Sequence, residues 1–149
     1  MKNLYDEFDE CENQKNIKKA ALEFRKLLEE EIKVIKNYEF DLFPRGSCLA
    51  SSVLLSSFLE KRGFGVFKLV FSKRNEKTHA WLQNHSLYID ITADQFKDNK
   101  EKVIVEKKEN SLFHRGFQID NIRDVDRLDF YDKKLFDLEK IINSKSKLF

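Results

Sequence analysis

The middle of the chain contains three residues whose side chains could act together in catalysis, in the order Cys48, His79 and Asp90. A thiol becomes a strong nucleophile when a neighbouring base takes its proton, and a third group commonly orients that base. Cysteine, histidine and aspartate can fill these three roles in that order. The combination indicates nucleophilic attack on a carbonyl carbon, provided that the fold brings the three side chains together.

The sequence around Cys48 favours a reactive thiol. A turn containing Pro44 and Gly46 precedes it, and a helix is predicted from about Ser47, the expected N-cap, to Arg62. The dipole and free N–H groups of a helix start favour thiolate over thiol, and the same N–H groups can stabilise an oxyanion. Ordinary burial in a core is the alternative for a lone cysteine on an apolar helix.

His79 and Asp90 belong to two consecutive strand candidates, "THAWLQ" and "SLYIDIT", which Asn84-His85 separates. A two-residue hairpin loop at Asn84-His85 would pair Trp81 with Tyr88 and His79 with Asp90. Directly opposed residues in such a hairpin are close enough for a carboxylate to reach an imidazole nitrogen. A cross-strand charge pair without a catalytic role is the alternative reading.

Alternation along the two strands supports the same arrangement. One face of the hairpin is uniformly apolar: Ala80, Leu82, Leu87, Ile89 and Ile91. The other face carries the large aromatic residues Trp81 and Tyr88 beside the His–Asp pair, a composition that suits a cleft. We therefore interpret Trp81 and Tyr88 as substrate-binding residues, with a place in the core as the alternative for Trp81.

These stretches resemble a known family. "GSCLASSVLLSSFLEKRGF", "HAWLQ" and "YIDIT" together resemble the transglutaminase-like branch of the papain-like cysteine protease superfamily, and are similar to lasso-peptide leader peptidases. The resemblance covers about Pro44 to Phe96, roughly a third of the chain. It implies that Cys48 is the nucleophile, His79 the general base and acid, and Asp90 the orienting residue. The chain departs from the papain signature at Leu49, where an aromatic residue would follow the cysteine.

The remaining elements flank this core. Amphipathic helices are predicted over about 13–38 and 122–144, and further strands over 64–72 and 102–107, whereas 110–121 has no regular pattern. We expect an α+β fold, with the nucleophile helix packed on a small antiparallel sheet and long N- and C-terminal helices. The length of 149 residues suggests one domain over 1–149, with its core at about 44–96.

Composition narrows the class of protein. Charged residues make up 36% of the chain but nearly cancel, to a net +2, which does not favour nucleic-acid binding. No apolar run is long enough to span a bilayer, and the N-terminus lacks the pattern of a secretory signal, so we expect a cytoplasmic protein that binds no membrane. Two cysteines and three histidines without metal-ligand spacing predict no cofactor and no metal. Cys11 is interpreted as an incidental thiol, His85 as a turn residue and His114 as a surface or loop residue, with part of a cleft wall as the alternative for "FHRGF".

The pattern leaves the exact reaction open. A thiol acyl-transfer enzyme that passes the acyl group to water would be a peptidase or amidase acting on a peptide or protein. Transfer to an amine would make it a transamidase. A binding module that keeps the fold without turnover is an alternative, and so is a toxin-like effector that deamidates or cleaves a target protein.

Overall fold

The structure is a computed structural model that describes residues 4–35 and 38–146. Its described part is an α+β fold built on a five-stranded antiparallel sheet in the order β4-β3-β2-β1-β5. The strands are β1 (Lys68–Arg74), β2 (Lys77–Gln83), β3 (Leu87–Asp90), β4 (Ile104–Lys107) and β5 (Gln118–Asp124). The predicted class and the antiparallel sheet are confirmed.

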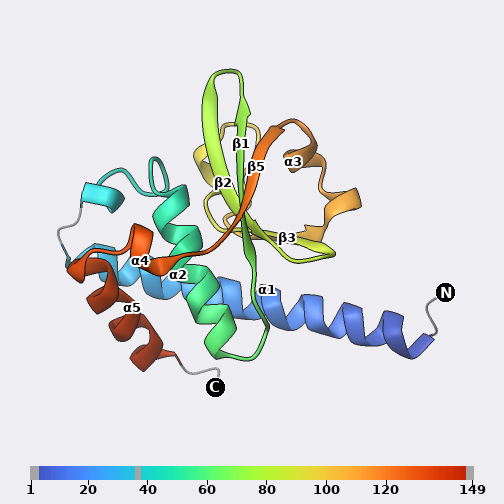
Figure 1. The fold of residues 1–149 in the computed structure, drawn as a ribbon, viewed down its shortest axis with the longest axis horizontal. Helices are drawn as coiled ribbons and strands as arrows, with labels where there is room; N and C mark the ends of the chain where they lie inside the picture. Colours follow the sequence, from blue (N-terminus) through green and yellow to red (C-terminus); the bar gives the residue numbers. More distant parts are fainter. Residues whose placement is uncertain (1–3, 36–37, 147–149) are drawn as a thin grey trace.

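Helices precede, interrupt and follow the strands (Figure 1). The helices are α1 (Leu4–Ile32), α2 (Cys48–Lys61), α3 (Leu112–Arg115), α4 (Arg127–Phe130) and α5 (Lys133–Lys145), with short 3-10 turns η1 (Tyr38–Phe40), η2 (Ala93–Gln95) and η3 (Lys108–Asn110). The predicted 13–38 helix is present, but it begins earlier, at Leu4, and ends at Ile32. Residues 36–37 of that prediction lie outside the described residues.

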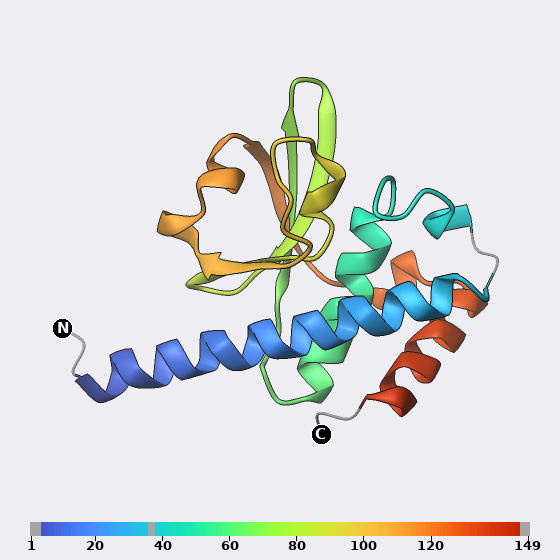
Figure 2. The same ribbon diagram turned by 180° about the vertical axis from the view of Figure 1, so that it is seen from behind.

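The main core lies between one face of the sheet and three helices, α1, α2 and α5. Helix α1 passes across α2 and α5, and its N-terminal part projects beyond the sheet (Figure 2). Apolar side chains repeat at steps of three and four residues in the helices and of two in the strands, so each element turns one apolar side inward. The fully buried members of this core include Ile17, Phe24, Leu28, Val53, Leu55, Phe58, Leu82 and Ile89.

A second, smaller cluster covers the opposite face of the sheet. It is built from the buried residues Val70, Trp81, Phe96 and Phe117, with the half-buried Tyr88 and Phe113 against them. Their aromatic rings enclose polar side chains instead of a purely apolar interior. The sheet therefore separates a large apolar core from a small aromatic one.

The β2–β3 hairpin differs from its predicted register. Leu82 pairs with Ile89 and Gln83 with Tyr88, so the two-residue loop and the predicted Trp81–Tyr88 and His79–Asp90 ladder pairs are wrong. The loop is longer because the Asn84 side-chain oxygen accepts hydrogen bonds from the N–H groups of Ser86 (2.9 Å) and Leu87 (2.7 Å). The register shifts by two places, and an even shift leaves every side chain on its predicted face.

The C-terminal third departs further from prediction. Residues 118–124, placed partly in an irregular segment and partly in a helix, form the edge strand β5, and all seven are exposed. Helix starts only at Arg127, and α5 begins after Asp132, whose carboxylate accepts the Leu135 N–H at 2.9 Å. Among the helices that the structure describes, none combines the length and apolar character required to traverse a bilayer.

Candidate functional site

Cys48 is the first residue of α2, as the sequence predicts. The preceding turn contains Gly46 at φ +69°, a left-handed conformation that glycine adopts without steric cost. Ser47 occupies the N-cap position, but its hydroxyl donates back to the Pro44 carbonyl at 3.0 Å and leaves the helix N–H groups uncapped. The Cys48 thiol is half-buried at this end, so it combines access with a helix N-terminus.

His79 lies on β2 and is almost completely buried, at 1% exposure. Its Nε2 lies 2.7 Å from Oδ2 of Asp90, while its Nδ1 lies 3.2 Å from the side-chain amide nitrogen of Gln95. The Cys48 side chain lies close enough to the ring to raise its pKa. Phe96 packs edge-on against the ring at a centroid distance of 4.9 Å. The imidazole thus contacts the Asp90 carboxylate and lies near the Cys48 side chain.

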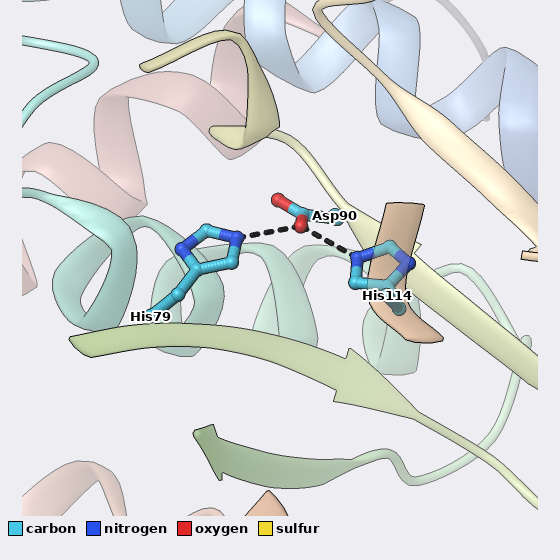
Figure 3. Close-up of side chains that lie close together, drawn as sticks. All are labelled: His79, Asp90 and His114. Carbon is cyan, nitrogen blue, oxygen red and sulfur yellow. Dashed lines mark hydrogen bonds and ion pairs between the residues drawn. The ribbon is translucent and has the colours of Figure 1, made fainter. Parts of the chain in front are cut away.

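Asp90 ends β3 and is also buried, at 1% exposure. Its Oδ1 accepts the Thr92 N–H at 3.0 Å, and its Oδ2 accepts hydrogen bonds from two histidine rings, His79 and His114 (Figure 3). Because the hairpin register is shifted by two, the contact with His79 is made diagonally across the two strands instead of directly opposite. The structure therefore brings Cys48, His79 and Asp90 together.

The charged groups of the site shift one another's pKa values. Burial alone lowers the pKa of His79, but the charge of Asp90, the hydrogen bond to Asp90 and then the interaction with Cys48 raise that pKa to about 9. Burial alone raises the pKa of Asp90, but the charge of His79 and the hydrogen bonds from both histidines hold it well below its usual range. Below pH 9 the site therefore contains an imidazolium next to a carboxylate.

Gln95 reaches the site from η2, the turn that follows β3. This turn is fixed to α1 by Arg25, whose guanidinium donates to both Asp94 carboxylate oxygens at 2.8 and 2.9 Å. The same guanidinium donates to the Ile91 carbonyl at 2.6 Å, and Arg25 is only 5% exposed. A buried bidentate ion pair holds a planar group in one orientation, so Arg25 positions Gln95 beside the imidazole.

Two adjoining hollows lie where Gln95 reaches the surface. One has a volume of about 390 Å³ and the other of about 660 Å³, and they share Arg45, Gln95, Phe96 and Lys97 in their walls. The larger hollow also contains Lys77 and one acidic residue, Glu76. Within the part of the chain that the structure describes, no carboxylate lies within 4.0 Å of Arg45, Lys77 or Lys97. The hollows are called the Gln95 groove below; their wall is basic.

The other predicted site residues have different surroundings. Trp81, expected either in the core or as a wall of the substrate cleft, is fully buried in the aromatic cluster at 0% exposure. Tyr88 is half-buried against Trp81, with ring centroids 5.4 Å apart. His85 is exposed in the β2–β3 loop, and Cys11 is exposed on α1, both as expected.

His114 is the site residue that sequence reasoning missed. It was interpreted as a surface or loop residue, but it lies on α3 at 3% exposure and contacts Asp90 through Nε2 at 2.8 Å. Phe113 and Phe117 on either side belong to the aromatic cluster around His79. The spacing of phenylalanines around "FHRGF" was the signal that could have placed this segment in a buried site.

His79, Asp90 and His114 also form a group that could hold a metal ion. One ligand atom from each lies within 4.8 Å of the others, and imidazole with carboxylate suits several transition metals. However, the two nitrogen–oxygen distances of 2.7 and 2.8 Å are those of direct hydrogen bonds. A metal could enter only if these side chains moved apart, so the arrangement fits a proton network better than a metal centre.

Comparisons with protein-family models, with curated proteins and with solved structures find no match to this chain. The function is therefore argued from the chemistry of the site alone.

Proposed function

We propose that this protein is a thiol-dependent acyl-transfer enzyme, a cysteine peptidase or amidase built on a transglutaminase-like, papain-like core. The observation that carries the proposal is the bridging position of His79. Its ring lies near the Cys48 side chain, which raises its pKa, and forms a hydrogen bond through Nε2 with the carboxylate of Asp90. A nucleophile, a base and an orienting acid in contact in this order are what acyl transfer requires.

The first half-reaction would form a thioester. In the proposed resting pair the Cys48 proton already lies on Nδ1 of His79, and the thiolate attacks the substrate carbonyl carbon to give a tetrahedral oxyanion. Because Nδ1 carries this proton, it cannot accept from Gln95 (3.2 Å in the structure), so the amide is free to donate to the oxyanion. The N–H groups at the start of α2 supply further donors.

Collapse of the oxyanion expels the leaving amine, which takes its proton from His79 and leaves the acyl group on the Cys48 sulfur. Water then gives up a proton to His79 and attacks the thioester, which releases a carboxylic acid and restores the thiol. An amine in place of water would give a new amide. We favour water because the chain contains no acidic calcium-binding loop of the kind that calcium-dependent transamidases use.

The Gln95 groove is the proposed substrate-binding surface. It adjoins the imidazole through Gln95, and its wall carries Arg45, Lys77 and Lys97 against two acids, Glu76 and Asp94, of which Asp94 is paired with Arg25. Cations without carboxylate partners favour a ligand that brings its own negative charge. The substrate is therefore proposed to be a peptide or protein segment with acidic side chains near the reacting carbonyl.

A peptide library analysed by mass spectrometry tests this function. Wild type and Cys48→Ala would each be incubated with the library and a primary amine probe. Cleavage, deamidation and amine incorporation change the peptide mass differently, so one experiment separates peptidase, amidase and transamidase. We expect Cys48-dependent products enriched in acidic peptides. A binding module without turnover would yield no product that requires Cys48, and that result would refute the proposal.

A further inference from the structure

A second histidine stands behind Asp90 on the side away from His79. Figure 3 shows the carboxylate between the two rings, with His79 from β2 and His114 from α3. Both histidines use Nε2, and both contact the same oxygen, Oδ2, at 2.7 and 2.8 Å. The carboxylate is thus held from two sides by elements that are far apart in the sequence.

The far side of His114 is also fixed. Its Nδ1 lies 2.5 Å from the Ser111 hydroxyl, which is itself buried at 1% exposure. A hydroxyl that donates to Nδ1 requires the proton of a neutral ring to be on Nε2, where it can be donated to Asp90.

Aromatic rings hold His114 in this orientation. Trp81 lies against it at a centroid distance of 4.4 Å, Phe113 at 5.0 Å and Tyr88 at 5.2 Å. Tyr88 is the titratable group among them, and Cys48 is the titratable group on the far side of His79. The ring has little freedom to serve any partner other than Asp90 and Ser111.

We propose that His114, oriented by Ser111, is a positioning residue. It fixes the Asp90 carboxylate and weakens the attraction of that carboxylate for the His79 proton. A hydrogen bond donated to an anion stabilises it and makes it less basic. Because both rings share Oδ2, the bond from His114 lowers the negative charge that His79 experiences. Asp90 stays ionised and correctly aimed, and the imidazolium gives up its proton more easily to a leaving group. The role in turnover rests on the function proposed above; the effect on His79 does not.

Histidine NMR tests the proposal without any substrate. Ring resonances of His79 would be titrated in a Cys48→Ala protein, with His85→Gln as the matched control because His85 is exposed in a loop. His114→Phe keeps a ring but removes the donor, His114→Gln restores an amide donor, and Ser111→Ala removes the orienting hydroxyl. We expect His79 to bind its proton about tenfold more tightly in His114→Phe, the value of one charged hydrogen bond. The effect should be smaller in Ser111→Ala and largely reversed in His114→Gln.

Turnover measured with Cys48 present gives the second readout. We expect kcat to fall at least tenfold in His114→Phe with KM nearly constant, and His114→Gln to recover most of the loss. If the His79 titration in the Cys48→Ala protein is unchanged by His114→Phe and by Ser111→Ala, the proposal is overturned, even if these variants lose stability. So does stoichiometric Zn²⁺ binding that shifts both histidines and is lost in His114→Phe. If the titration moves as expected but no Cys48-dependent product is ever found, the proposed function fails and the role of His114 toward Asp90 stands.

Discussion

Raising the pH from about 6 to about 9.5 should remove stability from this protein because His79 loses its proton over that interval. The pKa of His79 is about 9 in the folded chain, against an ordinary value of 6.5. A group with a raised folded pKa contributes stability that is fully present below the unfolded pKa and disappears as the pH rises through the folded pKa. The difference corresponds to about 3 kcal/mol of unfolding free energy, lost between roughly pH 6.5 and pH 9.

Urea unfolding at the two pH values measures this contribution. A Cys48→Ser background keeps thiol ionisation out of the comparison, and His79→Gln in the same background removes only the imidazole. The parent should lose about 2–3 kcal/mol more than His79→Gln between the two conditions, because the charge of Asp90 remains the main stabilising partner. An equal loss in both proteins would mean that His79 is neutral at pH 6 and would refute the electrostatic account of the site.

Three further predictions concern the surroundings of the imidazole. Arg25→Ala should cost about 2–3 kcal/mol of unfolding free energy because it leaves the half-buried Asp94 carboxylate without its bidentate partner. The exposed neighbour Lys26→Ala should cost less than about 0.5 kcal/mol, and equal losses in urea unfolding would contradict the anchoring role. Gln95→Ala should lower kcat about 10²-fold or more without changing the unfolding midpoint much, and unchanged kcat would remove the amide from the oxyanion site. Arg45→Glu with Lys97→Glu should raise KM about tenfold or more for acidic peptides but not for neutral ones; the same change for both would show that charge does not select the substrate.

The nucleophile helix and the faces of the hairpin could be predicted because their signals are local. Gly46 and Ser47 indicate a turn and a helix start independently of the rest of the chain. The predicted faces of His79 and Asp90 are correct despite the wrong loop length, because the register differs by two residues and the side-chain period of a strand is two. The loop length itself was mispredicted because Asn84 uses its side chain, instead of a tight backbone turn, to close the hairpin.

The position of His114 in the site, and strand β5, could not be predicted because they depend on contacts between segments that are distant in the sequence. His114 lies on a helix of only four residues, Leu112–Arg115, too short to show a periodic pattern. His114 is buried because Trp81 on β2 and Tyr88 on β3 pack against its ring. Strand β5 was missed because an edge strand with both faces exposed has no apolar alternation to reveal it. Neither feature has a signal in its own residues strong enough to outweigh a loop assignment.

The central claim is that Cys48 and His79 work as a pair, and the rate of alkylation against pH tests it most directly. Iodoacetamide would be applied from about pH 5.5 to 9.5 to Cys11→Ser and Cys11→Ser/His79→Ala proteins, with the exposed Cys11 in a Cys48→Ala protein as the reference thiol. An ordinary thiol is only about 1% ionised at pH 6.5.

We predict that Cys48 reacts at least tenfold faster than Cys11 at pH 6.5, with a rate nearly independent of pH up to about 8.5. His79→Ala should abolish this advantage by removing the cation next to the sulfur. A Cys48 whose rate rises with pH in parallel with Cys11, and is the same with or without His79, would contradict the account.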